Sequence, residues 1–184
     1  MTEDSLPRRA DGAEGPTTTK VLVVYGTKSG CTAGVAERIG VALERAGMAA
    51  DVLPAHDGPD PRDYDGVVAG SGVRAGRWHR AVTEWVAENA AALRAMPTAL
   101  YTVCLTLVTD PGKADEVRAY TDALLAESGI EPIDIGLFGG WFEPQRFGLV
   151  ERTVLKAMKA PRGDHRDWDA IDRWVAGVAP GLKS

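Results

Sequence analysis

Val21-Leu-Val-Val-Tyr-Gly-Thr-Lys-Ser-Gly-Cys-Thr32 is an apolar run that ends in glycines and small hydroxyl residues. The run from Val21 to Tyr25 is typical of a buried parallel strand, and an amphipathic helix is expected to begin near Gly30. The positive end of that helix would point at a loop containing the hydroxyls of Thr27, Ser29 and Thr32. Gly26 and Gly30 would let backbone N–H groups approach closely. The stretch therefore predicts a phosphate-binding loop, the alternative being an ordinary Gly/Ser turn between strand and helix.

Two other nucleotide-binding motifs fit the sequence less well. An ATP-type P-loop has its lysine after the last glycine, whereas Lys28 precedes Gly30 here. A dinucleotide fingerprint drawn from 70–75 would need an acidic residue at the end of a further strand, but Glu88 lies inside a helical pattern. The pattern Thr27-x-Ser29-Gly30-x-Thr32 remains.

Composition sets the class of protein. The chain has 184 residues, 45% of them hydrophobic, and a formal net charge of −5, which predicts one globular domain and no nucleic-acid partner. No apolar run has the length of a membrane span and no signal pattern is present, so we expect a cytoplasmic protein. Cys31 and Cys104 are expected to be reduced, and the three histidines form no metal-binding pattern. Residues 1–19 predict a disordered tail before a domain at 20–184.

Short apolar runs alternate with helical patterns along the rest of the chain, which predicts an α/β fold with a doubly wound parallel sheet. The expected strands are 21–25, 49–53, 66–71, 98–103 and 132–138, and the expected helices are 30–47, a segment from Trp78 to Leu93, 113–128 and a final helix around 171–178. Strand order 2-1-3-4-5 places ligands outside the carboxyl ends of the strands. The loops 27–32, 71–78 and 104–110 are therefore expected to form the site, with the loop 139–146 beside them.

The phosphate loop resembles that of flavodoxins, which holds the 5′-phosphate of FMN. Over residues 20–174 the chain is more closely similar to the flavodoxin-type, menaquinone-dependent protoporphyrinogen IX dehydrogenases, on the segments 70–79, 96–102 and 146–158 and the pair Asp167-Trp168. The resemblance implies a flavodoxin-like three-layer sandwich. It also implies an FMN-dependent oxidoreductase of haem biosynthesis that oxidises a porphyrinogen in three two-electron cycles and reduces a quinone. Two features depart from the family: the short connection 160–166, and a third loop without an aromatic side chain to cover the flavin.

Carried over by position, the resemblance implies cofactor-binding roles for three loops. The FMN-binding residues would be Thr27, Lys28, Ser29, Gly30, Cys31, Thr32, Ser71, Gly72, Val73, Arg74, Gly76, Trp78, Cys104, Leu105 and Thr106. Trp78 would stack on the flavin or lie in the core. Cys31 lies beside a helix N-terminus, where the pKa of a thiol can fall, but no second cysteine or nearby base supports catalysis, and packing beside the phosphate is the favoured interpretation. Candidate substrate contacts are Arg77, Trp141, Phe142 and Arg146, with a hydrophobic plug as the alternative for the two aromatic residues.

The segment Gln145–Lys159 predicts an extra amphipathic helix with Arg152, Lys156 and Lys159 on one side. A basic face of this kind favours an anionic membrane surface, or the propionates of a porphyrinogen together with Arg74, Arg77 and Arg146; the alternative is a solvated face. Two other functions stay open: an electron-carrier flavodoxin that shuttles electrons between proteins, and a degenerate domain that binds another phosphate ligand or only a partner. A different flavin or a deazaflavin in the same loop also stays open.

Overall fold

A five-stranded parallel sheet forms the centre of the structure, a computed structural model that describes residues 18–143, 148–157 and 161–183. The strand order is β2-β1-β3-β4-β5, as predicted. The strands are β1 (Lys20–Gly26), β2 (Ala49–Pro54), β3 (Gly66–Gly72), β4 (Thr98–Val103) and β5 (Ile135–Phe138), the last shorter than expected. Val21 to Val24 have no exposed surface, because β1 lies between β2 and β3 and is covered on both faces.

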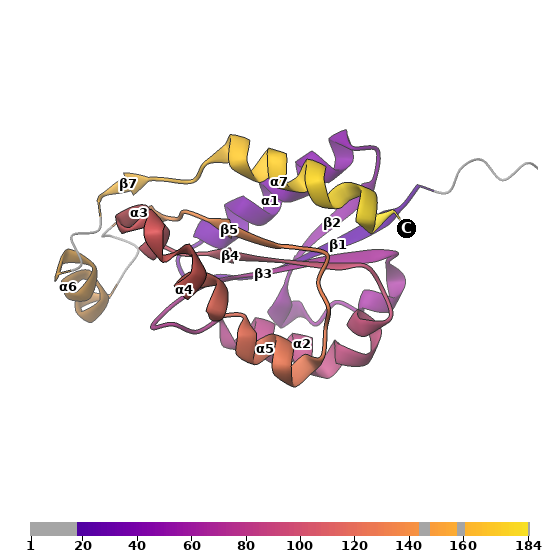
Figure 1. Cartoon of the computed structure of the whole chain (residues 1–184), viewed down its shortest axis with the longest axis horizontal. Helices are drawn as coiled ribbons and strands as arrows, with labels where there is room; N and C mark the ends of the chain where they lie inside the picture. Colours follow the sequence, from indigo (N-terminus) through magenta and orange to yellow (C-terminus); the bar gives the residue numbers. More distant parts are fainter. Residues whose placement is uncertain (1–17, 144–147, 158–160, 184) are drawn as a thin grey trace, which may run out of the picture.

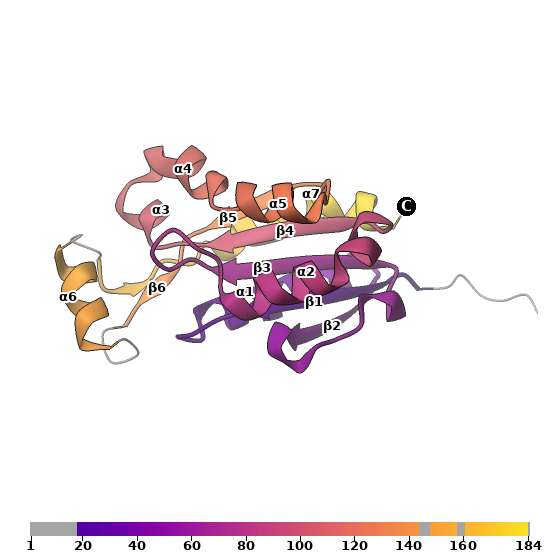
Figure 2. The same ribbon diagram turned by 90° about the horizontal axis from the view of Figure 1, so that it is seen from below.

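Helices cover both faces of the sheet and complete three layers (Figures 1 and 2). Helices α1 (Cys31–Arg45) and α7 (Trp168–Leu182) pack on one face, and α2 (Arg80–Arg94) and α5 (Asp122–Ser128) pack on the other. Short 3₁₀ turns lie at Ala55–Asp57, Pro61–Asp63 and Pro111–Lys113. Since all five strands are parallel, their carboxyl ends lie at the same edge of the sheet, and the strand order reverses direction beside β1.

The prediction of a single helix over 113–128 is wrong, because this segment forms two helices, α4 (Ala114–Ala119) and α5. The hydroxyl of Thr121 donates a hydrogen bond to the carbonyl of Arg118 at 2.6 Å, and the Thr121 amide donates to the same carbonyl at 3.0 Å. A threonine side chain that bonds the preceding turn competes with the helical ladder. The break places Tyr120 between the two helices rather than on a continuous buried face.

An excursion of the chain, residues 139–167, separates β5 from α7 at the carboxyl edge of the sheet. It contains β6 (Trp141–Phe142), which pairs antiparallel with β7 (Gly163–Asp164), and helix α6 (Leu149–Ala157) between them. Figure 1 shows α6 beyond the sheet, at the opposite end of the molecule from residue 18. The predicted extra helix is thus present over 149–157. Its expected ends at Gln145 and Lys159, like residues 1–17 of the predicted tail 1–19, lie outside the described residues.

Tyr101 on β4 is the largest side chain that is fully buried. Its ring packs against Phe138 and Trp174, with centroids 6.3 and 6.4 Å away. The hydroxyl has no hydrogen-bond partner among the described residues, and burial raises its pKa well above the ordinary value of 10.0. A buried donor without a partner costs stability.

We therefore expect Tyr101→Phe to raise the free energy of unfolding by about 1 kcal/mol at pH 7, measured by urea denaturation. The raised pKa means that the folded state favours the neutral phenol. Ionisation of Tyr101 in the unfolded state lowers the free energy of unfolding as the pH rises above 10, and it has no effect below that pH. Phenylalanine does not ionise, so the free energy of unfolding of the variant should fall less above pH 10. A loss of stability in Tyr101→Phe at pH 7 would contradict this interpretation.

Candidate functional site

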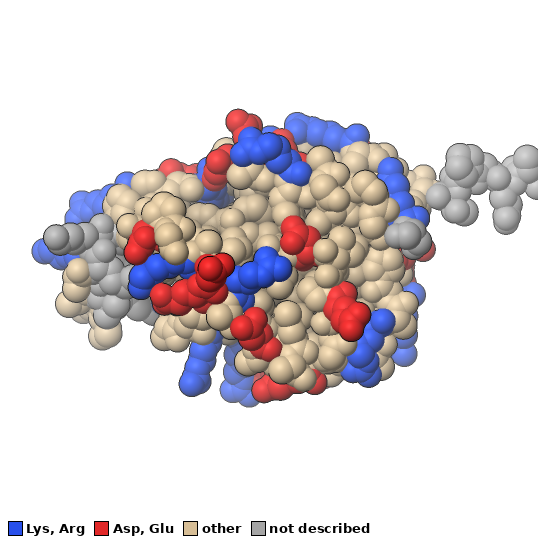
Figure 3. Space-filling view, viewed as in Figure 1, with Lys and Arg blue, Asp and Glu red and all other residues tan. Residues whose placement is uncertain are grey.

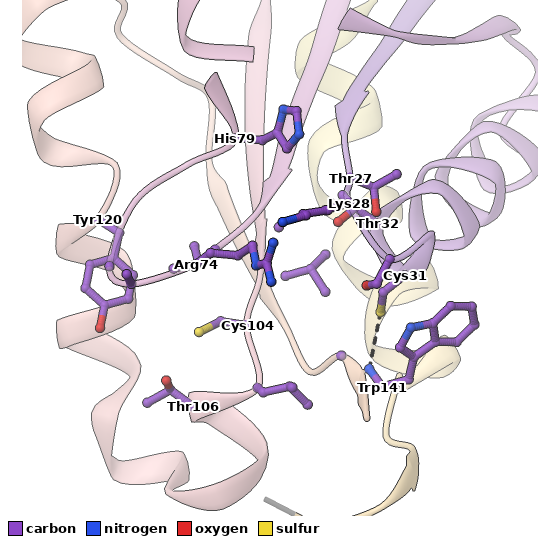
Figure 4. A pocket seen from close by; sticks show the side chains of 18 of the residues that line it. Thr27, Lys28, Cys31, Thr32, Arg74, His79, Cys104, Thr106, Tyr120 and Trp141 are labelled. Carbon is purple, nitrogen blue, oxygen red and sulfur yellow. Dashed lines mark hydrogen bonds between the residues drawn. The ribbon is translucent and has the colours of Figure 1, made fainter. Parts of the chain in front are cut away.

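A cavity of about 630 Å³ lies at the carboxyl edge of the sheet, within the range of small-molecule sites. Four segments line it: the loop after β1, the loop after β3, the segment from the end of β4 to Tyr120, and the excursion (Figure 4). The described lining residues are Thr27, Lys28, Ser29, Cys31, Thr32, Gly72, Val73, Arg74, Ala75, Gly76, His79, Val103, Cys104, Leu105, Thr106, Lys113, Glu116, Tyr120, Gly140, Trp141 and Val150.

The loop after β1 presents an open helix N-terminus to this cavity. The hydroxyl oxygen of Thr27 accepts a hydrogen bond from the Gly30 amide at 3.0 Å and so closes the turn. Gly30 precedes α1 with φ of 87°, a conformation that favours glycine, and offers no side chain as a cap. No acidic residue lies in the first turn of α1. By contrast, His79 caps α2 and Asp167 caps α7. The uncapped amides of α1 suit an anion such as a phosphate.

Hydrogen bonds close the loop after β3 at its base, and the chain reverses direction at its tip. The Ser71 hydroxyl accepts from the His79 amide at 2.7 Å and donates to the Gly72 carbonyl at 2.9 Å. At the tip, the backbones of Arg74 and Arg77 bond each other twice at 3.0 Å around a two-residue turn in which both φ values are positive. These bonds fix the loop that carries Arg74 into the cavity, where Figure 4 shows it pointing toward Lys28.

The third wall comes from the end of β4 and from the segment that follows it. Cys104, Leu105 and Thr106 line the cavity, the last at the start of the short helix α3 (Thr106–Thr109). Tyr120, at the break between α4 and α5, adds the aromatic ring that the third loop lacks. Its hydroxyl donates to Glu116 at 2.9 Å, which raises the pKa of Tyr120 and lowers that of Glu116. Tyr120 is half-buried and packs against the core on the α2 side of the sheet as well as lining the cavity.

The excursion forms the fourth wall through Gly140, Trp141 and Val150. A cluster that we call the arginine clamp fixes it to α1. The Arg166 guanidinium lies 4.4 Å from the ring centroids of both Trp141 and Trp168, and its Nη2 pairs with Asp164 at 2.6 Å. This side chain is only 10% exposed and lies against Gly34 of α1. The clamp positions Trp141 at the cavity.

Cys31 joins the same wall to the loop after β1. Its sulfur accepts a hydrogen bond from the Trp141 amide at 3.2 Å (Figure 4). Burial raises the pKa of the Cys31 thiol, and the bond from Trp141 only partly opposes this. Desolvation outweighs the Trp141 hydrogen bond and the Arg166 charge, which lower the pKa, so the packing interpretation of Cys31 holds. A neutral thiol at this position is a packing and hydrogen-bonding group.

Most predicted cofactor-binding residues gather around the cavity, and a few lie outside its lining. Gly30 forms the turn between β1 and α1, and buried Ser71 bonds within the loop after β3. Trp78 is 6% exposed and its Nε1 donates to Thr102 at 3.2 Å, so the core alternative holds; it also precedes α2 rather than starting it.

Of the candidate substrate residues, only Trp141 is among the described lining residues. Phe142 is buried at 4% exposure, so for this ring the alternative of a hydrophobic plug holds, and Arg77 is exposed outside the cavity. Arg146 lies outside the described residues. His79, Lys113 and Glu116 also line the cavity, and no sequence pattern distinguished them.

Comparisons with known proteins agree with this arrangement. A family model described as a flavodoxin domain matches residues 22–169. A protoporphyrinogen IX dehydrogenase [quinone] of Escherichia coli K12 is 27% identical over 171 residues, which cover 87% of this chain and 94% of that protein. A protein of the same name from Leishmania major is 27% identical over 172 residues, covering 87% and 74%.

Solved structures share the fold. Oxidised flavodoxin 1 from Bacillus cereus matches with a TM-score of 0.58 at 14% identity, covering 88% of this chain and 98% of that chain. A flavodoxin from the domain Archaea matches with a TM-score of 0.57 at 17% identity, covering 90% and 99%.

Proposed function

Because this chain belongs to the flavodoxin domain family, we propose that it binds FMN, oxidises protoporphyrinogen IX and passes the electrons to a quinone. Oxidation to the porphyrin removes six hydrogens in three two-electron cycles, and each cycle converts one quinone to the quinol. Bound FMN would supply the two-electron chemistry, while the protein binds and orients the reactants. The named relatives, at 27% identity, support this choice of substrate and acceptor.

The observation that carries the proposal is the excursion at the cavity. A cofactor site needs only the loops at the carboxyl edge of the sheet, but here Gly140, Trp141 and Val150 add a further wall. An extra wall fixed by a buried arginine clamp supports a substrate pocket more than an open surface for electron transfer between proteins. The enzyme is therefore favoured over the electron-carrier flavodoxin.

The described residues fit FMN. The uncapped amides of α1 and the hydroxyls of Thr27, Ser29 and Thr32 would hold the phosphate, with Lys28 beside them as a cation. Gly72 to Gly76 would lie along one side of the ring system and Cys104 to Thr106 along another. Tyr120 and Trp141 would exclude water from opposite walls.

The experiment adds FMN to the purified protein and records the visible spectrum, then adds protoporphyrinogen IX and a menaquinone analogue without oxygen. Quinone-dependent porphyrin fluorescence is the expected result. FMN binding without turnover would contradict the substrate and favour an electron carrier. Failure to bind FMN would overturn the cofactor assignment.

A quinone acceptor makes membrane contact a natural extension, and we propose that α6 provides it. Leu149 and Val150 are 80% and 77% exposed, and Arg152 and Lys156 lie on the same helix. Figure 3 shows Lys and Arg side chains at the end of the molecule that carries α6. Exposed apolar side chains beside cations suit an anionic lipid surface. None of the described helices has the length and apolar character of a membrane-crossing segment.

We expect the double variant Arg152→Glu, Lys156→Glu to bind phosphatidylglycerol-containing vesicles at least about tenfold more weakly, because each cation near such a surface contributes about 1 kcal/mol. Vesicle co-sedimentation measures this. The control is Arg118→Glu, Arg173→Glu, which makes the same charge change at exposed positions on α4 and α7. Equal binding by both double variants would remove α6 as the contact.

A further inference from the structure

His79 borders the cavity beside the loop after β1, although it caps a helix that follows β3. A Cβ added at Gly26, the last residue of β1, would lie 2.9 Å from the Cβ of His79 and 3.1 Å from its Cγ. The base of the histidine side chain thus packs against the residue directly before Thr27. Figure 4 shows the imidazole in the same part of the cavity as Thr27 and Lys28. The ring therefore lies at the end of the cavity that suits a phosphate.

One nitrogen of the His79 imidazole is already engaged within the protein. Its Nδ1 accepts a hydrogen bond from the Ala81 amide at 3.3 Å and so caps α2. A ring nitrogen that accepts carries no proton, so the neutral ring carries its proton on Nε2. Nε2 forms no hydrogen bond to the described residues. The capping bond therefore leaves a fixed donor on a half-buried side chain that lines the cavity.

A second polar group without a partner lies across the end of β1. Thr32 on α1 lines the cavity with 1% of its surface exposed, and its hydroxyl forms no hydrogen bond to the described residues. This hydroxyl faces the loop after β3, since a Cβ added at Gly72 would lie 2.8 Å from Thr32 Oγ1. Helices α1 and α2 pack on opposite faces of the sheet, so Thr32 and His79 approach the end of β1 from its two faces. A buried hydroxyl without a partner points to a polar ligand beside it.

We propose that His79 binds the phosphate of FMN by donating a hydrogen bond from Nε2, opposite the open N-terminus of α1. This inference rests on the proposed function, because it requires FMN in the cavity. A phosphate that contacts the α1 amides keeps oxygen atoms free on the side of α2, and these oxygens accept strong hydrogen bonds. Because Nδ1 is held by the cap, the ring can meet an anion only through Nε2–H. The cap of α2 thus prepares the phosphate-binding donor before FMN arrives.

The test separates the two nitrogens of His79 by substitution. His79→Ser keeps a preferred cap of α2 but removes the donor, because the serine hydroxyl lies close to the backbone. His79→Gln does the reverse, because its amide N–H reaches about as far as Nε2 whereas glutamine is not a preferred cap. The control is His56→Ser, at an exposed position outside the described lining of the cavity.

Dissociation constants are measured for FMN and for riboflavin, which lacks the phosphate, and unfolding of the FMN-free protein is followed in urea. His79→Ser should weaken FMN binding at least about tenfold and riboflavin binding less than about twofold, because a hydrogen bond to a charged group is lost. Its urea midpoint should stay at the wild-type value. His79→Gln should keep its FMN affinity within about threefold of wild type while its urea midpoint falls. His56→Ser should change neither quantity.

The outcomes separate this inference from the proposed function. If the wild-type protein binds FMN but His79→Ser keeps its affinity, or loses FMN and riboflavin equally, His79 does not bind the phosphate and only this inference fails. If both His79 variants lose FMN equally, packing of the ring against Gly26 supports the site in place of the donor, which also overturns the inference. If the wild-type protein binds no FMN, the proposed function fails and the inference fails with it.

Discussion

Ser29→Asp is expected to weaken FMN binding by at least about a hundredfold while changing riboflavin binding by less than about threefold. Ser29 lines the cavity one residue before Gly30, where the open N-terminus of α1 begins. A carboxylate there would take the helix amides that suit a phosphate and would repel the phosphate itself. A hundredfold loss corresponds to about 2.7 kcal/mol. Riboflavin lacks the phosphate, so the same carboxylate has little effect on it. Quenching of flavin fluorescence in a titration measures both ligands.

The control for this prediction is Ala87→Asp, which changes the net charge equally on the exposed side of α2. It should leave both affinities unchanged. The melting temperature of Ser29→Asp should not fall, since negative charge near a helix N-terminus is favourable. Parallel loss of FMN and riboflavin would show that the substitution damages the ring site, and the phosphate assignment of the loop would then be wrong.

The sheet and the position of the loop after β1 could be predicted because their signals are local. An uncharged run such as Val21–Tyr25 must be buried on both faces, and alternating strands and helices leave few topologies. The position of three loops at one edge then follows from strand order alone. Thr27 to Thr32, Gly72 to Gly76 and Cys104 to Thr106 could thus be assigned to one site before any contact was known.

The remaining walls depend on contacts between distant segments. Tyr120 faces the cavity because the hydroxyl of Thr121 bonds the turn before it, and threonine occurs in many unbroken helices. Trp141 lines the cavity because β6 pairs with β7, and strands of two residues have no period to detect. Helical spacing at Trp78 is compatible both with stacking on the flavin and with packing in the core. Its hydrogen bond to Thr102 places the side chain in the core. These features follow from tertiary packing.

The arginine clamp should make a glycine-to-alanine substitution in helix α1 destabilising. Alanine normally stabilises an exposed helix position relative to glycine by about 1 kcal/mol. Gly177 in α7 meets this condition, because a Cβ added there would contact nothing within 4 Å. At Gly34 in α1, the same Cβ would overlap the guanidinium of Arg166. We therefore expect Gly177→Ala to raise the melting temperature and Gly34→Ala to lower it.

The guanidinium has no easy alternative position. It lies between two tryptophan rings and bonds Asp164 through two nitrogens, at 2.8 and 2.6 Å. Moving it would give up both ring contacts and leave the carboxylate without its partner, so we expect Gly34→Ala to cost about 2 kcal/mol in net stability. Displacement of Arg166 would also move Trp141, so FMN should bind more weakly in this variant and unchanged in Gly177→Ala.

A double-mutant cycle tests the cause of this loss. Arg166→Leu alone should destabilise the protein, because it removes the ring contacts and leaves Asp164 without its partner. In that background the overlap with a Cβ at position 34 is gone, so Gly34→Ala should become neutral or stabilising, as Gly177→Ala is. A coupling energy near 2 kcal/mol would locate the effect in the contact between α1 and the excursion. If Gly34→Ala destabilises equally with and without Arg166, its cost lies within α1, and the clamp does not fix the wall of the cavity through this contact.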